Sequence, residues 1–138
     1  MYQVLFAEDE LLVRLGLQNS IDWKAYDMEL AAQADNGLQA YELFQKVRPD
    51  VVITDIRMPD VDGIELMRQC RLQWANTSIV VISGYDDFKY AQQAIEYGAS
   101  AYLLKPVDKQ ELYRVVEKAW QSANARRATI VNTSYSLF

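Results

Sequence analysis

Short apolar runs alternate with amphipathic segments along nearly the whole chain, and this alternation restricts the fold more than any other feature of the sequence. The runs are rich in β-branched or aromatic residues and mostly continuous, which is typical of strands covered on both faces of a parallel sheet. They occupy residues 4–7, 30–32, 51–53, 79–82 and 101–104. Between them apolar residues recur at helical spacing, as in residues 40–47 and 112–120. Five successive βα units therefore predict an α/β domain whose open parallel sheet is covered by helices on both sides.

Polar residues at the expected helix starts support this order. In three pairs a capping residue precedes a Glu or Gln by three positions, so that the first side chain can cover a free backbone N–H. The pairs are Asn36 with Gln39, Asp62 with Glu65, and Asp108 with Glu111. Residues 20–23 predict a short extra turn before the second strand, and the helical pattern fades beyond about residue 123. We expect one domain over residues 1–122 and a linker or disordered tail over residues 123–138.

Residue types that are absent or rare exclude several kinds of chemistry. The 138 residues contain no histidine, which excludes a Ser-His-Asp triad, a histidine general base and histidine-ligated metals. A single cysteine excludes a disulfide framework or a cysteine zinc site within one chain. The formal net charge of −5 does not favour direct binding of nucleic acid. The apolar runs are too short to span a membrane and no signal peptide is evident, so we expect a cytoplasmic protein without membrane contact.

Polar residues follow four of the five apolar runs directly. Glu8 and Asp9 follow the first run, Asp55 follows the third run after Thr54, Ser83 follows the fourth and Lys105 the fifth. Because the carboxyl ends of parallel strands meet at one edge of a sheet, we expect these groups to converge on one site.

Such a cluster of carboxylates requires a cation to offset its mutual repulsion. Oxygen ligands without His or Cys suit Mg²⁺, with Mn²⁺ as a second possibility. A carboxylate can act as a nucleophile toward phosphorus and form an aspartyl phosphate, while a metal and a lysine neutralise charge on the transferred group. The groups expected at this edge are therefore chemically able to support phosphoryl transfer.

Four motifs in this order resemble the receiver domains of two-component response regulators. They are Phe6-Ala7-Glu8-Asp9-Glu10, the run from Asp55 through Pro59 to Gly63, Ser83-Gly84-Tyr85, and Leu104-Lys105-Pro106. The resemblance covers about residues 2–120 and implies the flavodoxin-like (βα)5 doubly wound fold, with five parallel strands in the order 2-1-3-4-5.

The resemblance also implies a role for each matching residue. Asp55 would accept the phosphoryl group, and Glu8 and Asp9 would hold Mg²⁺ directly or through water. Asp55 itself and the backbone carbonyl of Arg57 would complete the metal ligands. Glu8 departs from the Asp that many relatives carry.

Further roles concern the response to phosphate. Ser83 would donate a hydrogen bond to the phosphoryl group and Lys105 would pair with it, with a cis bond between Lys105 and Pro106. Tyr102 falls at the family's aromatic switch position. Arg57 and Tyr85 flank the expected path of an attacking water, so we expect both to tune dephosphorylation.

Partners follow from the same resemblance. With no histidine of its own, the chain would take its phosphoryl group from a sensor histidine kinase or a small acyl phosphate. Residues 83–91 are similar to receivers fused to an AraC-type helix-turn-helix domain, which implies transcription regulation by a DNA-binding domain absent from this chain. A homodimer through the fourth helix, fifth strand and fifth helix is plausible.

Four alternatives stay open at this point. A small Mg²⁺-dependent phosphatase also uses an aspartate nucleophile, but it needs a second acid where Arg57 stands. An FMN binder of this fold needs a phosphate-cradling loop in place of Glu8-Asp9-Glu10. A stand-alone receiver without DNA output and a degenerate receiver that takes no phosphate are the others. We expect a phosphoacceptor that catalyses only its own phosphorylation and dephosphorylation, and not an enzyme with a separate substrate.

Overall fold

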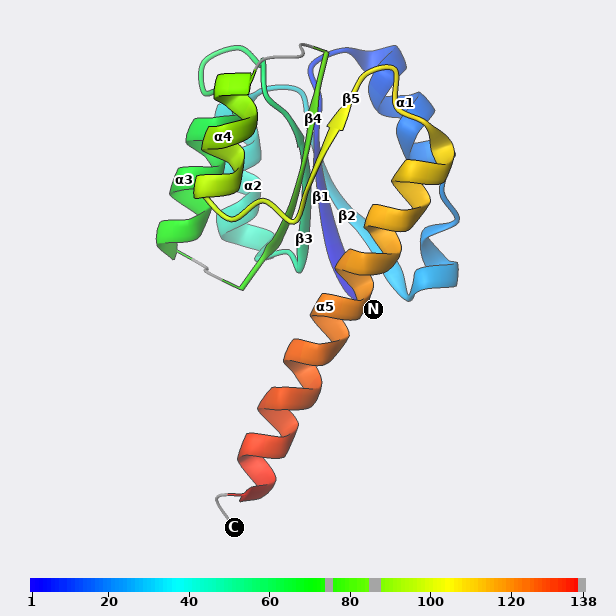
Figure 1. Ribbon diagram of the computed structural model, residues 1–138, viewed down its shortest axis with the longest axis vertical. Coiled ribbons are helices and arrows are strands. Elements are labelled where there is room, and N and C mark those ends of the chain that lie inside the picture. The colour runs from blue at the N-terminus through cyan, green and yellow to red at the C-terminus, as the bar shows by residue number, and fades with distance from the viewer. Residues whose placement is uncertain (74–75, 85–87, 137–138) are drawn as a thin grey trace.

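The computed structural model describes residues 1–73, 76–84 and 88–136. Its five strands form one parallel sheet in the order β2-β1-β3-β4-β5, which confirms the expected fold (Figure 1). The strands are β1 (Tyr2–Ala7), β2 (Met28–Ala34), β3 (Val51–Asp55), β4 (Ser78–Ser83) and β5 (Ala101–Leu104).

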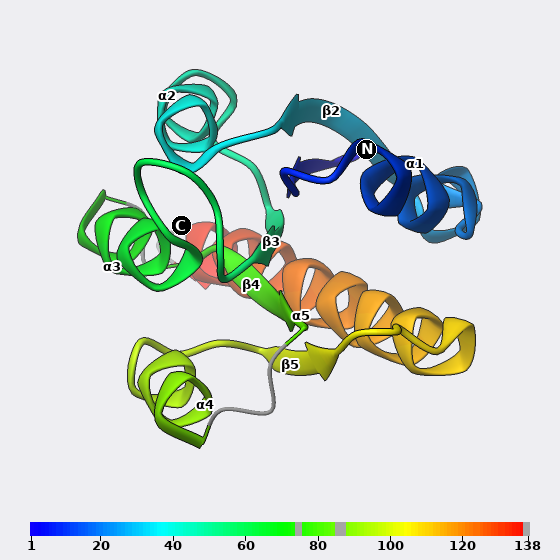
Figure 2. The ribbon, with the colours of Figure 1, turned by 90° about the horizontal axis from the view of Figure 1, so that it is seen from above.

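The helices lie on both faces of this sheet. The α-helices are α1 (Leu11–Asn19), α2 (Gly37–Val47), α3 (Gly63–Gln73), α4 (Phe88–Glu96) and α5 (Lys109–Ser136), and a 3₁₀ helix, η1 (Trp23–Tyr26), supplies the expected extra turn. Seen from above, α2, α3 and α4 cover one face, whereas α1 and α5 cover the other (Figure 2). No described helix is both long enough and apolar enough to cross a membrane.

Two apolar clusters hold the layers together, one on each face of the sheet. On the α2, α3 and α4 face, Phe44 and Met67 pack against strand residues such as Leu5 and Val52. On the other face, Leu112 and Val116 of α5 belong to a cluster with strand residues. The central strands β3 and β4 are buried along their whole length, as their continuous apolar sequence predicts.

Side chains cap three helices as the sequence predicts, with small differences. Asn36 accepts a hydrogen bond from the Gln39 N–H (2.8 Å), and Asp62 accepts one from the Glu65 N–H (2.8 Å). Asp108 caps α5 through the N–H of Gln110, one position earlier than expected. These caps fix where α2, α3 and α5 begin.

The last helix is longer than the sequence pattern indicates. We expected a linker or disordered tail beyond residue 122, but α5 continues to Ser136. Its next turn contacts the sheet: Ala123 is buried, Asn124 accepts a hydrogen bond from the Tyr2 hydroxyl (3.0 Å), and Arg126 donates to the Ser78 hydroxyl (3.2 Å). Residues 127–136 contain neither proline nor glycine that would end a helix. The division of the chain at residue 122 remains a prediction.

Candidate functional site

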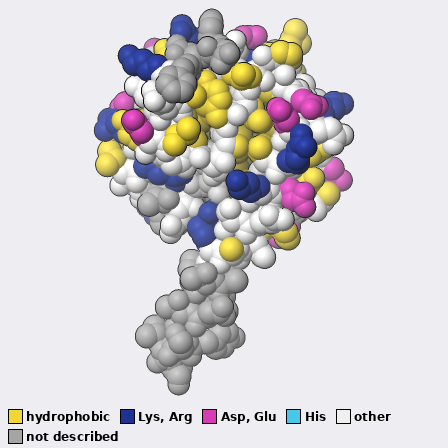
Figure 3. Space-filling model, viewed as in Figure 1, with side chains coloured by type: hydrophobic (Ala, Val, Ile, Leu, Met, Phe, Trp, Pro, Cys, Tyr) yellow, Lys and Arg dark blue, Asp and Glu magenta, His cyan; other side chains and the backbone are white. Residues whose placement is uncertain are grey.

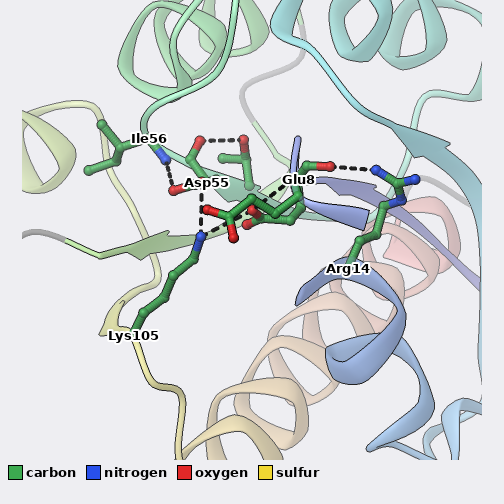
Figure 4. A network of polar contacts seen from close by, with 7 residues as sticks. Glu8, Arg14, Asp55, Ile56 and Lys105 are labelled. Carbon is green, nitrogen blue, oxygen red and sulfur yellow. Dashed lines mark hydrogen bonds and ion pairs between the residues drawn. The ribbon is translucent and has the colours of Figure 1, made fainter. Parts of the chain in front are cut away.

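The polar residues that follow the strands do converge at one edge of the sheet. Glu8 follows β1, Asp55 ends β3, Ser83 ends β4 and Lys105 follows β5. Figure 4 shows the side chains of Glu8, Asp55 and Lys105 pointing toward one another. Strands that are far apart in the sequence thus place one ammonium and two carboxylates in contact.

Lys105 joins the two buried carboxylates. Its Nζ lies 3.0 Å from Oε1 of Glu8 and 3.1 Å from Oδ2 of Asp55. The Lys105 side chain is 18% exposed, and the Glu8 and Asp55 side chains are 1% and 7% exposed. Ion pairs screened this little by water are stronger than pairs on the open surface. The ammonium therefore holds both carboxylates in fixed positions.

Asp55 is fixed by its neighbours as well as by Lys105. Its Oδ1 accepts a hydrogen bond from the Ile56 N–H (2.8 Å), and its carbonyl accepts one from the Thr54 hydroxyl (2.9 Å). The Asp55 backbone is also packed against Gly63, where an added Cβ would lie 2.1 Å from the Asp55 carbonyl oxygen. Only glycine allows α3 to start this close to the end of β3.

The two carboxylate oxygens of Glu8 differ in their surroundings. Oε1 accepts hydrogen bonds from Lys105 and, at 3.3 Å, from the Glu10 N–H. Oε2 is buried and has no hydrogen-bond partner in the described part of the chain. A buried carboxylate oxygen without a donor is unfavourable unless a cation or donor meets it. Glu8 therefore retains one ligand position that the protein itself does not fill.

Burial and charge shift the pKa values of all three groups. Burial and the nearby Asp55 raise the pKa of Glu8 to about 7. Burial also raises the pKa of Asp55, although the hydrogen bond from Lys105 works against this. Burial disfavours the charged form of Lys105, but its hydrogen bonds to Glu8 and Asp55 outweigh burial and raise the pKa of Lys105. One ammonium does not fully neutralise two buried carboxylates, so the site accommodates a further positive charge.

A cavity of about 350 Å³ opens beside these groups, lined by Asp9, Glu10, Asp55, Arg57, Gly84 and Lys105. Carboxylate oxygens of Glu8, Asp9 and Glu10 lie within 4.8 Å of one another. Asp9 and Glu10 are exposed, whereas Glu8 is buried. An oxygen-only donor set with one unpartnered buried oxygen fits a hard divalent cation such as Mg²⁺. Glu10, which is not among the metal ligands that the resemblance implies, belongs to this cluster by position.

The other residues expected at the site differ in their burial and contacts. Ser83 is buried at the end of β4, and Tyr102 is half-buried and packs against the cluster on the α2, α3 and α4 face. Arg57 is exposed, with its guanidinium 5.5 Å from the ring centre of Tyr90. The bond between Lys105 and Pro106 is cis, as the resemblance implies. Tyr85 lies outside the described residues.

Sequence reasoning missed two residues that shape the site. Arg14 donates a hydrogen bond from its guanidinium to the Glu8 carbonyl (2.6 Å; Figure 4). Gly63 permits the close approach of α3 to Asp55. Arg14 does have a sequence signal, because it is the only charged residue in α1. A lone charge on the helix that follows an acidic turn is a candidate partner for that turn.

Comparison with known proteins agrees with this geometry. Residues 4–117 match the family model described as the response regulator receiver domain. The chain is 36% identical over 118 residues to the uncharacterized transcriptional regulatory protein YesN of Bacillus subtilis, covering 86% of this chain and 32% of the relative. It is 38% identical over 112 residues to the transcriptional regulatory protein HptR of Staphylococcus aureus, covering 81% of this chain and 44% of that protein. The chain thus spans less than half the length of these curated relatives.

Solved structures agree as well. The receiver domain of AraT, a response regulator from Geobacillus stearothermophilus, superposes with a TM-score of 0.87 at 42% identity, covering 91% of this chain and 98% of that one. The two-component transcriptional regulator AraC from Clostridium phytofermentans superposes with a TM-score of 0.82 at 32% identity, covering 94% and 99% of the two chains. The family match covers most of the chain, and the order of strands and the convergence of acids and lysine agree with it. The chain belongs to the response regulator receiver domain family.

Proposed function

We propose that this chain receives a phosphoryl group on Asp55 and that Mg²⁺ supports the transfer. The observation that carries the proposal is the contact of Lys105 with both Asp55 and the buried Glu8, beside an open cavity lined with carboxylates. The site has a fixed nucleophile, a fixed cation and space for a tetrahedral phosphoryl group. These are the parts that phosphoryl transfer to a carboxylate requires.

The transfer follows from the positions of these groups. A carboxylate oxygen of Asp55 attacks phosphorus, a P–O bond to Asp55 forms, and the bond to the donor breaks so that the donor leaves with the electron pair. The Ile56 amide holds Oδ1 of Asp55, which leaves Oδ2 on the side of the Lys105 ammonium. Lys105 then pairs with the negative oxygens of the phosphoryl group.

The metal would be held by Glu8, Asp9 and Asp55, with the Arg57 carbonyl as a further ligand. Bound there, Mg²⁺ would neutralise charge on the phosphoryl oxygens during transfer. The unpartnered Oε2 of Glu8 and the exposed carboxylate of Asp9 support this ligand set. Ser83 is proposed to bind the phosphoryl group from the end of β4, and Tyr102 to respond to that contact. Arg57 and Tyr85 are proposed to set how long the phosphoryl group persists.

The phosphoryl donor is proposed to be the phosphohistidine of a sensor histidine kinase, encountered in the cytoplasm. The lack of any histidine in this chain supports an external donor. Its longer relatives include proteins named as transcriptional regulators, which supports transcription control through a DNA-binding domain outside this chain. Self-catalysed phosphorylation and dephosphorylation, without turnover of a separate substrate, complete the proposal.

The proposal is tested by labelling the chain with acetyl phosphate and Mg²⁺ and separating phosphorylated protein on a phosphate-affinity gel. We expect Asp55→Asn to abolish the labelling, because an amide is a poor nucleophile and carries no negative charge. Asp62→Asn is the matched control, since Asp62 is an exposed helix cap and Asn caps equally well. Labelling of Asp55→Asn at the wild-type level would contradict the proposal. Steady turnover of a generic phosphate ester would favour the phosphatase alternative instead.

A further inference from the structure

Arg14 is placed to control the acidic turn from the helix that follows it. One guanidinium nitrogen of Arg14 donates a hydrogen bond to the carbonyl of Glu8 at 2.6 Å. Figure 4 shows the side chain reaching back from α1 toward the end of β1. No other residue of α1 carries a charge. The contact therefore joins the first helix to the residue that presents the buried carboxylate.

Within the described residues, the sheet supplies no backbone donor to the Glu8 carbonyl. β1 ends at Ala7, and the Glu8 N–H still pairs with the Ala34 carbonyl of β2 (3.0 Å). The Glu8 carbonyl instead accepts its hydrogen bond from Arg14. The backbone N–H of Arg14 also donates to the Glu10 carbonyl (2.9 Å). One residue thus holds both ends of the turn formed by Glu8, Asp9 and Glu10.

A purely structural contact would not need an arginine here. The Nε of Arg14 is buried and has no hydrogen-bond partner among the described residues. A buried unpaired N–H is unfavourable, and a neutral side chain would avoid it. In the described part of the chain Arg14 forms no ion pair with Glu8, Asp9 or Glu10, so its guanidinium contacts the backbone of the turn and not its carboxylates. Arg14 therefore keeps a buried N–H without a partner while its other nitrogen holds the Glu8 carbonyl.

We propose that Arg14 is a positioning residue for the magnesium site, because its hydrogen bond to the Glu8 carbonyl fixes the direction in which Glu8 and Asp9 present their carboxylates. The proposal rests on the proposed function and adds a residue that contacts neither the phosphoryl group nor Asp55. Groups that orient the ligands of a metal affect its affinity nearly as strongly as the ligands do. Removal of the guanidinium should then reduce the affinity for Mg²⁺, with a smaller effect on the stability of the metal-free fold.

The test measures Mg²⁺ affinity by calorimetric titration of the full chain, together with the melting temperature of the metal-free protein. Arg14→Met keeps the length of the side chain and removes every donor, and we expect it to raise the dissociation constant for Mg²⁺ about tenfold. Arg14→Lys retains one charged donor and should recover part of the lost affinity. Arg68→Met is the matched control, since Arg68 pairs with Glu65 on the surface of α3, and it should leave the affinity unchanged.

Labelling with acetyl phosphate separates metal binding from chemistry. For Arg14→Met, the initial labelling rate should fall at limiting Mg²⁺ and return to the wild-type value at saturating Mg²⁺. A wild-type dissociation constant in Arg14→Met, with or without a lower melting temperature, would overturn the inference. If Arg14→Met does not fold, the Mg²⁺ affinities of Arg14→Lys and Arg14→Gln are measured in the same way. Affinities equal to that of the wild type in both variants would overturn the inference too. A wild-type chain that binds no Mg²⁺ overturns the proposed function itself, before any Arg14 variant is needed.

Discussion

Glu8 is the residue whose environment in the site is least favourable. Its side chain is 1% exposed, one of its oxygens lacks a partner, and its pKa is raised to about 7. An acid whose pKa is higher in the folded state than in the unfolded chain stabilises the fold only while it is protonated. Its contribution is present below pH 4.5, the ordinary value, and is lost as the pH rises through 7. The ionised form of Glu8 that the proposed metal binding requires is therefore the form that destabilises the metal-free fold.

Replacement of Glu8 by Gln should separate these two effects. In the presence of a chelator at pH 8, Glu8→Gln should be more stable than the wild type by on the order of 2–3 kcal/mol, because Gln cannot ionise. At pH 4.5 the difference should vanish, and Mg²⁺ should bind more weakly to the variant. Thermal melting at both pH values provides the measurement, with Glu42→Gln as control, since Glu42 is exposed on α2. Equal melting temperatures for Glu8→Gln and the wild type at pH 8 would argue against a strained Glu8.

Cys70 should be unreactive in the folded protein. It is fully buried in the cluster between α2, α3 and the sheet, and burial raises the pKa of its thiol to about 12. Since only the thiolate is nucleophilic, a disulfide reagent should modify the folded chain at least about a hundredfold more slowly than the chain unfolded in urea. The reaction is read from the absorbance of the released thiol, and Cys70 is the only cysteine in the sequence. Rapid modification without denaturant would show that α3 opens away from the core.

At the scale of elements, the start of α3 determines where Asp55 lies. An added Cβ at Gly63 would lie 2.1 Å from the Asp55 carbonyl oxygen, and the Gly63 N–H donates to the Ile56 carbonyl (2.6 Å). Gly63→Ala should therefore move the end of β3, lower the stability by about 2 kcal/mol and reduce labelling of Asp55. Chemical denaturation and the phosphate-affinity gel measure the two effects.

Gly16 offers a matched control for this substitution. It lies inside α1, and an added Cβ there would meet no atom within 4 Å. Gly16→Ala should raise the stability by about 0.5–1 kcal/mol, because alanine loses less backbone entropy in a helix. If both variants behaved alike, the contact between α3 and Asp55 would not be the cause of the effect at Gly63.

Most elements and the composition of the site could be predicted from the sequence, because both depend on local patterns. The continuous apolar run before Asp55 predicts a buried strand, and the rule that parallel strands end at one edge brings Lys105 to the same place. The bonds made by Arg14 could not be predicted, because they depend on how α1 packs against the end of β1. The length of α5 was missed for a similar reason, since Asn124 and Arg126 find partners only at the opposite end of the sheet.

At the scale of the whole molecule, one face is suited to contact between two copies of the chain. In the view of Figure 3, apolar side chains gather between α4 and α5, over β5. Ile95 of α4 is 72% exposed and Leu104 of β5 is 42% exposed. The half-buried Tyr102 lies in β5, which pairs with β4. In this pair, Ser83 of β4 lies opposite Leu104 of β5. We expect a change at the proposed phosphorylation site to reach this face through one pair of strands.

We expect phosphorylation to promote dimerisation through this face. In sedimentation experiments with acetyl phosphate and Mg²⁺, the wild type should shift toward a dimer and Ile95→Asp should stay a monomer, because a charge would be buried in the interface. Leu72→Asp is the matched control, since Leu72 is 74% exposed on α3, which is not one of the elements of this face. Lys105→Ala should still accept some phosphate but should not dimerise. A dimer of Ile95→Asp as strong as that of the wild type would place the interface elsewhere.

Two glycines beside the loop after β3, Gly37 and Gly63, make one side of the site more rigid than the other. An added Cβ at Gly37 would lie 1.7 Å from the Val61 carbonyl oxygen, so backbone is packed directly on backbone there as it is at Gly63. Peptide groups in such contact have no side-chain rotamers through which to yield. On the other side of Asp55, a lysine with four rotatable bonds spans the gap to β5. If Asp55 carries a phosphoryl group as proposed, we expect strain there to be relieved toward β4 and β5, which would give the signal a direction before any partner is bound.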